Sequence, residues 1–350
     1  MSGFDLSKVI RPHVLALKPY SSARDEYSGH EGVFLDANEN PLGSVGGGNY
    51  NRYPDPYQQE IKKKLAIIKG VQPQQIFLGN GSDEAIDLLI RAFCEPKEEK
   101  ILITPPTYGM YRVSADVNLV EVKEVPLSPD FNLQVDEILK ELDELTKLVF
   151  LCSPNNPTGN SLRKADVEKV LEKAKGVVVV DEAYIDFSAE ESYITLLDRY
   201  PNLVVMQTFS KAWGLAGLRL GMAFASPELI GFINKIKPPY NINQLTQEKA
   251  LESLGQYTSQ KKMVEEILKE RKGLAEELKS LPTVRKIYPS DANFLLVKID
   301  DATEVYNKLV SKHVIVRNRS SVQLCADCLR ITVGSKSENN ELLKSLRELF

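Results

Sequence analysis

Residues 208–221 read TFSKAWGLAGLRLG, and the rest of the chain can be interpreted around them. They follow the apolar run LVVM at 203–206, whose composition predicts a buried strand. Ser210 and Lys211 therefore lie just beyond the carboxyl end of that strand, at the edge where open α/β sheets bind ligands. Three glycines within eight residues allow the backbone to approach a bound molecule closely. We expect this stretch to form part of a ligand site.

Lys211 has the sequence neighbours of a reactive amine. Phe209 and Trp213 would partly desolvate it, and desolvation disfavours the ammonium form and frees the amine to form a Schiff base. Arg219 adds a fork of donors suited to phosphate, and Ser210 adds a hydroxyl. This combination indicates a phosphorylated carbonyl compound held covalently, for which pyridoxal phosphate is the leading candidate. The alternative is that Lys211 and Arg219 are ordinary exposed charges, which is the default for lysine.

The composition is that of a globular protein. The chain has 350 residues, of which 43% are apolar and 26% charged, and its length suggests about two domains. The net charge of −4, with both signs interspersed, argues against a nucleic-acid or anionic-membrane surface. No apolar run approaches the length of a membrane span, and residues 1–5 do not begin a signal peptide, so we expect a cytoplasmic location.

The cysteines and histidines predict no metal site. Cys325 and Cys328 have the C-x-x-C spacing of redox or zinc motifs, but no second pair accompanies them. Only three histidines occur in the whole chain, which makes a histidine-rich metal site improbable.

Short apolar runs alternate with helical patterns through most of the chain. This pattern predicts an α/β fold with a mostly parallel central sheet covered by helices on both faces. We expect a large α/β domain over residues 46–265 and a small α+β domain over 266–350. The irregular residues 1–45 would form an arm that packs on the small domain or on a dimer partner. The runs that we interpret as strands are 75–78, 101–104, 148–151, 177–180, 203–206, 221–225, 293–297, 314–316 and 329–333.

Polar residues gather directly after the strands of the large domain. If these strands are parallel, their carboxyl ends place the polar residues along one edge of the sheet. Asp181 follows four valines, where a pyridinium nitrogen would supply the positive partner that a carboxylate needs, although a helix N-cap is the alternative. Asn156 and Tyr184 could donate to the ring oxygen of the cofactor, although the segment around Asn156 could also be a plain turn.

Other residues are candidates for binding anions. Gly81 and Ser82 stand at the head of an amphipathic helix, whose first amides could bind phosphate. Tyr108 could stack on the cofactor ring or simply fill the core. Arg330 lies in an apolar strand and Arg317 follows another, so both would need an anion, whereas Arg319 reads as solvated.

Several motifs together resemble those of fold-type I pyridoxal-phosphate-dependent aminotransferases. They are residues 208–217, SPNNPTG at 153–159, DEAY at 181–184 and the spacing from Lys211 to Arg219. More narrowly, the chain is similar to the histidinol-phosphate aminotransferase family. The stretches that carry this similarity are RP at 11–12, PY at 19–20, NRYP at 51–54, PPTYGMY at 105–111 and CLRITVG at 328–334.

The resemblance implies a role for each matching residue. Lys211 would bind pyridoxal 5'-phosphate covalently and transfer protons, assisted by Asp181 and Tyr184. Tyr53 would reach the phosphate of the cofactor in the other subunit, which implies an obligate homodimer. The residues that would bind the cofactor are Gly81, Ser82, Asp83, Tyr108, Asn156, Asp181, Tyr184, Ser210, Lys211, Arg219 and Tyr53. Those that would bind the substrate are Tyr20, Asn38, Tyr53, Arg317 and Arg330.

The expected reaction is transamination of L-histidinol phosphate with 2-oxoglutarate, a step of histidine biosynthesis. The alternatives are an aromatic amino-acid aminotransferase and a lyase similar to threonine-phosphate decarboxylase. A pyridoxal-binding regulator would need an attached DNA-binding domain, for which the chain has no spare length. Neither nucleic acid nor membrane is expected as a partner.

Overall fold

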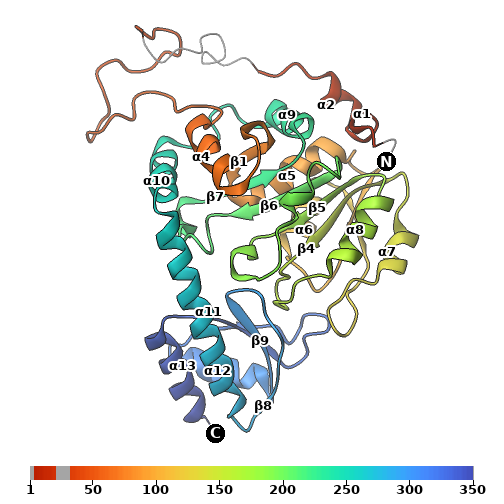
Figure 1. The fold of residues 1–350 in the computed structure, drawn as a ribbon, viewed down its shortest axis with the longest axis vertical. Helices are drawn as coiled ribbons and strands as arrows, with labels where there is room; N and C mark the ends of the chain where they lie inside the picture. Colours follow the sequence, from red (N-terminus) through yellow and green to blue (C-terminus); the bar gives the residue numbers. More distant parts are fainter. Residues whose placement is uncertain (1–3, 21–31, 350) are drawn as a thin grey trace.

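The computed structural model describes residues 4–20 and 32–349 and divides them between a large and a small domain. In Figure 1 the large domain lies above the small one, and a long helix runs from one to the other. The large domain holds a seven-stranded sheet in the order β1-β7-β6-β5-β4-β2-β3. Its strands are β1 (Ile76–Asn80), β2 (Lys100–Ile103), β3 (Glu121–Glu124), β4 (Thr146–Cys152), β5 (Val177–Asp181), β6 (Leu203–Thr208) and β7 (Leu220–Phe224).

The prediction of a mostly parallel sheet is confirmed. The neighbouring strands from β6 across to β3 pair in parallel, whereas β7 is antiparallel to both β1 and β6. The apolar pattern of the sequence does not predict strand β3, because this strand reads EVKE and none of its residues is fully buried. A hydrophobic pattern cannot identify such an edge strand.

Helices cover both faces of this sheet and create two apolar cores. Strand β5 explains why four valines follow one another: Val178 and Val180 belong to one core, and Val177 and Val179 belong to the other. A strand buried on both faces needs apolar side chains at every position. Helices α4 (Gln59–Lys69), α7 (Val135–Glu141) and α8 (Lys164–Lys173) line the first core, and α5 (Gly81–Phe93), α6 (Met110–Val117) and α9 (Pro227–Ile236) line the second.

The N-terminal part of the arm, residues 4–16, forms two short helices that pack on the large domain. Helices α1 (Leu6–Val9) and α2 (Pro12–Ala16) bury Leu6, Val9 and Val14 in the second core. Arg11 donates from Nε and Nη2 to the carboxylate of Glu95 at 2.9 and 3.0 Å. In the single chain these residues therefore pack on the large domain rather than on the small one. Packing on a dimer partner remains a prediction.

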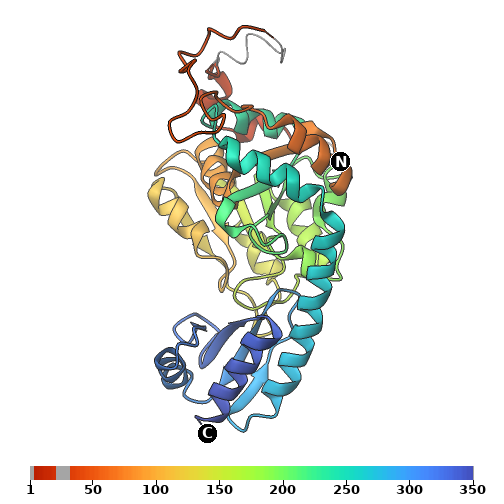
Figure 2. The ribbon, with the colours of Figure 1, turned by 90° about the vertical axis from the view of Figure 1, so that its left-hand side faces the viewer.

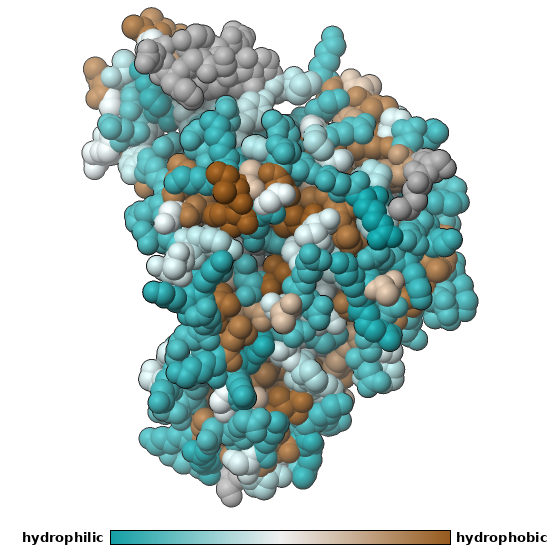
Figure 3. All heavy atoms as spheres, viewed as in Figure 1, coloured by the Kyte–Doolittle hydropathy of each residue, from teal (hydrophilic) through white to brown (hydrophobic). Residues whose placement is uncertain are grey.

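Residues 32–57 form an extended loop without helix or strand, which runs away from the body at the top of Figure 1. Leu35, Leu42 and Val45 are each more than 80% exposed. In Figure 3 apolar side chains, drawn in brown, appear along this extended loop. Exposed apolar side chains of this number on one segment indicate an interaction surface.

The small domain contains a four-stranded sheet in the order β10-β11-β9-β8. Its elements are α11 (Tyr257–Lys279), β8 (Val284–Ile287), β9 (Phe294–Ile299), α12 (Ala302–Ser311), β10 (Arg317–Asn318), β11 (Cys328–Thr332) and α13 (Lys336–Arg347). Leu295, Val297, Leu329 and Ile331 form one face of the sheet and pack into a core with these helices. Figure 2 shows the small domain and its helices below the large domain. The opposite face of the sheet is directed towards the large domain.

The prediction of a strand at 314–316 is wrong. The Val314 amide instead donates to the carbonyl of Leu309 and closes the end of α12, so that the strand begins only at Arg317. Helix α10 (Gln244–Leu254) precedes the long helix α11. Within the described residues there are also four short 3₁₀ helices: η1 (Pro73–Gln75), η2 (Ile185–Phe187), η3 (Tyr193–Leu196) and η4 (Ala216–Leu218). None of the helices within residues 4–20 and 32–349 has the length and apolar character needed to cross a bilayer.

Candidate active site

A cavity of about 650 Å³ opens where the carboxyl ends of β4, β5 and β6 face the small domain. Both domains line it, so that its shape depends on how they pack together. Most of the predicted site residues meet here. They are Gly81, Ser82, Asp83, Tyr108, Asn156, Asp181, Tyr184, Ser210, Lys211, Arg219, Arg317 and Arg330.

Three predicted residues lie elsewhere in the single chain. Tyr20 is 75% exposed and borders a small hollow beside Lys237. Asn38 and Tyr53 border another hollow, where the Tyr53 ring stacks on Tyr240 with centroids 4.4 Å apart. The fold of one chain therefore does not bring these side chains to the cavity. Their contacts with a ligand remain predictions.

Lys211 extends into the cavity from the turn after β6. Its Nζ lies 5.5 Å from the centroid of the Tyr184 ring. Partial burial lowers the pKa of Lys211, and the positive charge of Arg330 lowers it further, while the negative charge of Asp181 acts in the opposite direction. A lysine with a lowered pKa carries more of the neutral amine, which is the nucleophilic form.

Asp181 ends β5 with its carboxylate buried at 3% exposure. Its oxygens accept hydrogen bonds from the Tyr111 hydroxyl at 2.6 Å and the Ala183 amide at 3.0 Å. Burial raises the pKa of Asp181 despite these donors. No ion pair with a basic side chain is recorded for it within the described ranges, so the site can accept a cationic group beside this carboxylate.

Tyr111 is a site residue that sequence reasoning missed. It lies on α6, three residues after Tyr108, which precedes the helix, and the two rings meet edge to face with centroids 5.6 Å apart. Its ring stacks on Phe150 at 4.7 Å, which fixes the hydroxyl against Asp181. The signal in the sequence is the second tyrosine of PPTYGMY, three residues after Tyr108. The hydroxyl of Tyr108 itself donates to Asp83 at 3.0 Å.

An anion cradle forms where α5 begins beside Arg219. The predicted role of the Gly81 amide is corrected here, because that amide donates to the Arg219 carbonyl at 2.6 Å. The next amides, of Ser82 and Asp83, are the ones at the helix start that can bind an anion. Arg219 Nη1 lies 3.5 Å from the Ser210 hydroxyl, and Nη2 lies 3.6 Å from the Asp83 carboxylate.

The SPNNPTG segment has separate uses for its two asparagines. Asn155 is buried and holds the loop in place, donating to the Pro106 carbonyl and to the Thr158 hydroxyl. Asn156 faces the cavity, where its side-chain oxygen accepts from Nη1 of Arg330. The segment therefore connects the large domain with the arginines of the small one.

Three arginines enter the cavity from the small domain. Arg317 on β10 pairs with Arg330 on β11, and Arg330 lies 5.2 Å from the Phe294 ring centroid. The third is Arg319, which we expected to be solvated. That prediction is wrong, because Arg319 is half-buried and lines the cavity. The sequence signal for its position is the spacing of two residues from Arg317, since alternate residues of an extended chain point to the same side.

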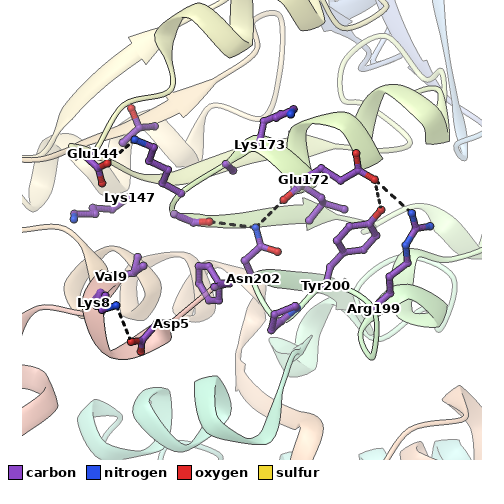
Figure 4. Close-up of a pocket in the computed structure, with 17 residues that line it drawn as sticks. Asp5, Lys8, Val9, Glu144, Lys147, Glu172, Lys173, Arg199, Tyr200 and Asn202 are labelled. Atoms are coloured by element: carbon purple, nitrogen blue, oxygen red, sulfur yellow. Dashed lines mark hydrogen bonds and ion pairs between the residues drawn. The ribbon is translucent and has the colours of Figure 1, made fainter. Parts of the chain in front are cut away.

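A second cavity, of about 640 Å³, lies at the opposite edge of the sheet beside α1 (Figure 4). Its charged side chains are largely paired with one another: Arg199 with Glu172 at 3.4 Å, and Lys8 with Asp5 at 3.4 Å. It contains no reactive amine or buried unpaired charge comparable to those around Lys211. Within the described residues, no cluster of three or more histidine, cysteine, aspartate or glutamate side chains is suited to a metal ion.

The residues of the first cavity fit pyridoxal phosphate. A buried carboxylate without a cationic partner suits a pyridinium nitrogen, and the start of α5 with Arg219 and Ser210 suits a phosphate. The amine of Lys211 lies in the same cavity and suits the aldehyde. Both the geometry and the donor set therefore agree with an enzyme that uses this cofactor for chemistry on amines.

Comparison with known proteins leads to the same class. The sequence model described as Aminotransferase class I and II matches residues 31–346, and the chain belongs to this family. The histidinol-phosphate aminotransferase of Parabacteroides distasonis is 56% identical over 345 residues, which cover 99% of each chain.

Solved structures agree in fold. The histidinol-phosphate aminotransferase from Clostridium acetobutylicum has a TM-score of 0.79 at 25% identity, covering 86% of this chain and 91% of that one. The histidinol-phosphate aminotransferase from Sinorhizobium meliloti, solved in complex with pyridoxal-5'-phosphate, has a TM-score of 0.78 at 23% identity and covers 90% of both chains. The predicted fold class, fold-type I of the pyridoxal-phosphate-dependent enzymes, is confirmed.

Proposed function

We propose that this aminotransferase moves the amino group of L-histidinol phosphate to 2-oxoglutarate with pyridoxal 5'-phosphate as cofactor. One observation carries the proposal: a single cavity joins the amine of Lys211 to three arginines of the small domain. The amine is suited to the cofactor, and the arginines are suited to a strongly anionic substrate. The substrate matches the name of relatives more than 50% identical over nearly the whole chain.

The bound cofactor supplies an electron sink that stabilises negative charge at the substrate carbon. Asp181 would keep the ring nitrogen protonated, and Tyr111 and the Ala183 amide donate to its carboxylate and hold it in position. Lys211 would hold the cofactor and would then take and return the proton at the substrate carbon. Burial and the nearby arginine charge assist that step because both lower the pKa of Lys211.

Two of these arginines, Arg317 and Arg330, serve both half-reactions. In the first they bind the phosphate of the amine donor, and in the second they bind a carboxylate of the dicarboxylic acid. Guanidinium groups suit both anions because their paired donors match phosphate and carboxylate oxygens alike.

Turnover with competing substrates tests this proposal. We expect the purified protein with pyridoxal phosphate to form glutamate from L-histidinol phosphate and 2-oxoglutarate. An aromatic aminotransferase would instead prefer L-phenylalanine as the donor. A threonine-phosphate decarboxylase would release carbon dioxide from O-phospho-L-threonine without any acceptor. Either preference, with no glutamate formed from L-histidinol phosphate, would contradict the proposal.

We also propose that the active unit is a homodimer in which Tyr53 acts in the partner's site. Tyr53 is 51% exposed and lies outside the cavity of its own chain, although the motif around it matches the family. The exposed apolar side chains of residues 33–45 support the same conclusion, because a second copy would cover them. A cytoplasmic location remains a prediction from the sequence.

A further inference from the structure

The third arginine of the cavity has a position fixed by the small sheet. Arg317 and Arg330 are directly opposite one another in an antiparallel pair, so both side chains leave the same face of the sheet. Arg319 follows Arg317 by two residues, and its amide donates to the Cys328 carbonyl at 2.8 Å, which continues the pairing. All three arginines therefore line the cavity from one face of the sheet.

These arginines have few partners of their own. Within the described ranges none of the three is recorded in an ion pair with a carboxylate, and Arg330 donates to the uncharged amide of Asn156. The Nε atoms of Arg319 and Arg330 are buried without a hydrogen-bond partner. Buried unpaired donors and clustered like charges both oppose folding, so this arrangement requires a compensating anion.

The number of cations distinguishes between possible anions. A carboxylate carries one charge and two oxygens, which one guanidinium can satisfy with two parallel hydrogen bonds. A phosphate monoester carries close to two charges and presents three free oxygens at neutral pH. Two arginines suffice to bind a carboxylate. A third arginine finds a partner only in the additional charge and the additional oxygen of a phosphate.

We propose that Arg319 is the residue that makes this site selective for a phosphate dianion over a carboxylate. Arg317 and Arg330 serve both half-reactions, whereas Arg319 contributes mainly when the phosphate-bearing amine is bound. This inference rests on the proposed function and assigns the specificity of that reaction to one side chain.

The test uses Arg319→Gln in the holoenzyme and two ligands that differ only in the phosphate. The loss of one charged contact should weaken the apparent affinity for L-histidinol phosphate by about 10- to 100-fold. The affinities for L-histidinol and for L-glutamate should change by less than about threefold, with kcat nearly unchanged. Arg319→Lys keeps the charge and should recover part of the loss.

Arg285→Gln is the matched control. Arg285 lies on β8 of the same sheet, is paired with Asp300 and does not line the cavity. Its replacement should leave all three affinities unchanged. If Arg319→Gln weakens all three ligands equally, or none of them, Arg319 does not determine specificity and the inference is overturned.

The dependence on pH adds a readout that a structural role would not produce. A phosphate monoester dianion takes up one proton near pH 6 and becomes a monoanion, so the wild-type affinity for L-histidinol phosphate should fall as the pH is lowered through that value. Arg319→Gln should flatten this dependence. An unchanged pH profile in the variant would contradict the inference.

Inorganic phosphate separates this inference from the proposed function. It should inhibit the half-reaction with glutamate in the wild type, and Arg319→Gln should raise its inhibition constant by a similar factor. If L-histidinol phosphate is not a substrate but this inhibition depends on Arg319, the proposed reaction fails and phosphate selectivity is retained. If turnover of L-histidinol phosphate occurs but the inhibition constant of phosphate is the same in the wild type and in Arg319→Gln, the proposed reaction holds and only the role of Arg319 in selectivity fails.

Discussion

Asp181 and Glu182 are adjacent acidic residues with opposite surroundings. Asp181 faces the cavity, whereas Glu182 points into the protein and accepts from the Ser192 hydroxyl, the Tyr193 amide and the Gln207 side chain. Successive residues of an extended chain point to opposite sides, so one carboxylate can serve the site while the other holds the surrounding loops.

At the residue scale, Lys211→Ala should abolish turnover while leaving the fold intact. Positioned proton transfer is worth typically about 10²–10⁴-fold, and the loss of covalent cofactor binding should carry the reduction beyond that range. The measurements are kcat with L-histidinol phosphate and the mass of the protein after borohydride reduction. Lys169→Ala, at an exposed position of α8, is the control. If Lys211→Ala keeps most of the activity, Lys211 has no part in the mechanism.

Glu182 should make stability depend on pH. Burial raises the pKa of Glu182 from 4.5 to about 7, so between these values the native state binds more protons than the unfolded chain. The free energy of unfolding should therefore fall as the pH rises through this window, by at most about 1.4 kcal/mol per pH unit from this group.

Glu182→Gln isolates that contribution. The variant should be less stable, because its amide would face one of the three donors, but it should lose this part of the slope between pH 4.5 and 7. Chemical unfolding at several pH values measures the difference. An equal slope in both proteins would show that Glu182 does not titrate in this range.

At the scale of elements, β7 and the start of α5 must approach each other closely. A side chain at Gly221 would clash with the Ser82 amide and the Gly81 carbonyl carbon. Gly221→Ala should therefore displace the start of α5 and weaken pyridoxal phosphate binding by roughly tenfold or more, as a lost anion contact implies. Gly217→Ala is the control, because a side chain there meets nothing within 4 Å. Equal cofactor affinity in the two variants would contradict the assignment of the phosphate cradle.

Elements with strong apolar patterns could be predicted from the sequence, and those that depend on local hydrogen bonds could not. Strand β5 was evident from its four valines, and Lys211 and Asp181 were placed correctly at the sheet edge. Strand β8 was missed because VRKI offers no clear alternation of apolar residues. The Gly81 amide was misassigned because its partner, the Arg219 carbonyl, is distant in sequence.

The same limit applies to side chains in the site. Tyr111 reaches Asp181 across 70 residues of sequence, a contact that only the tertiary fold reveals. Arg319 looked like a surface charge because its own neighbours in the sequence are polar. Its environment is set by the large domain opposite, which no local pattern describes.

At the scale of the whole molecule, the two domains each supply part of the site. The large domain contributes Lys211, Asp181 and the anion cradle, and the small domain contributes the arginines. Helix α11 extends from one domain to the other (Figures 1 and 2), and Asn156 bonds to Arg330 across the cavity. Binding of the substrate anion should therefore draw the domains together, which couples recognition to exclusion of water.

Hybrid dimers test whether Tyr53 serves the partner's site. Tyr53→Ala and Lys211→Ala should each be nearly inactive alone. When they are mixed and allowed to exchange subunits, each hybrid contains one intact site, and random pairing should restore roughly a quarter of wild-type activity. Sedimentation would check that the variants still form dimers. If mixing restores nothing although hybrids form, Tyr53 acts within its own chain or not at all.

The most direct test of the proposed reaction is the absorbance spectrum of the purified holoenzyme during one cycle of substrates. Bound pyridoxal phosphate should give a visible band that disappears when L-histidinol phosphate is added and returns with 2-oxoglutarate. That result would establish the cofactor, the amine donor and the acceptor in one experiment. A band that persists with L-histidinol phosphate but changes with an aromatic amino acid would contradict the proposed substrate. The absence of any band after incubation with pyridoxal phosphate would contradict the assignment of the site itself.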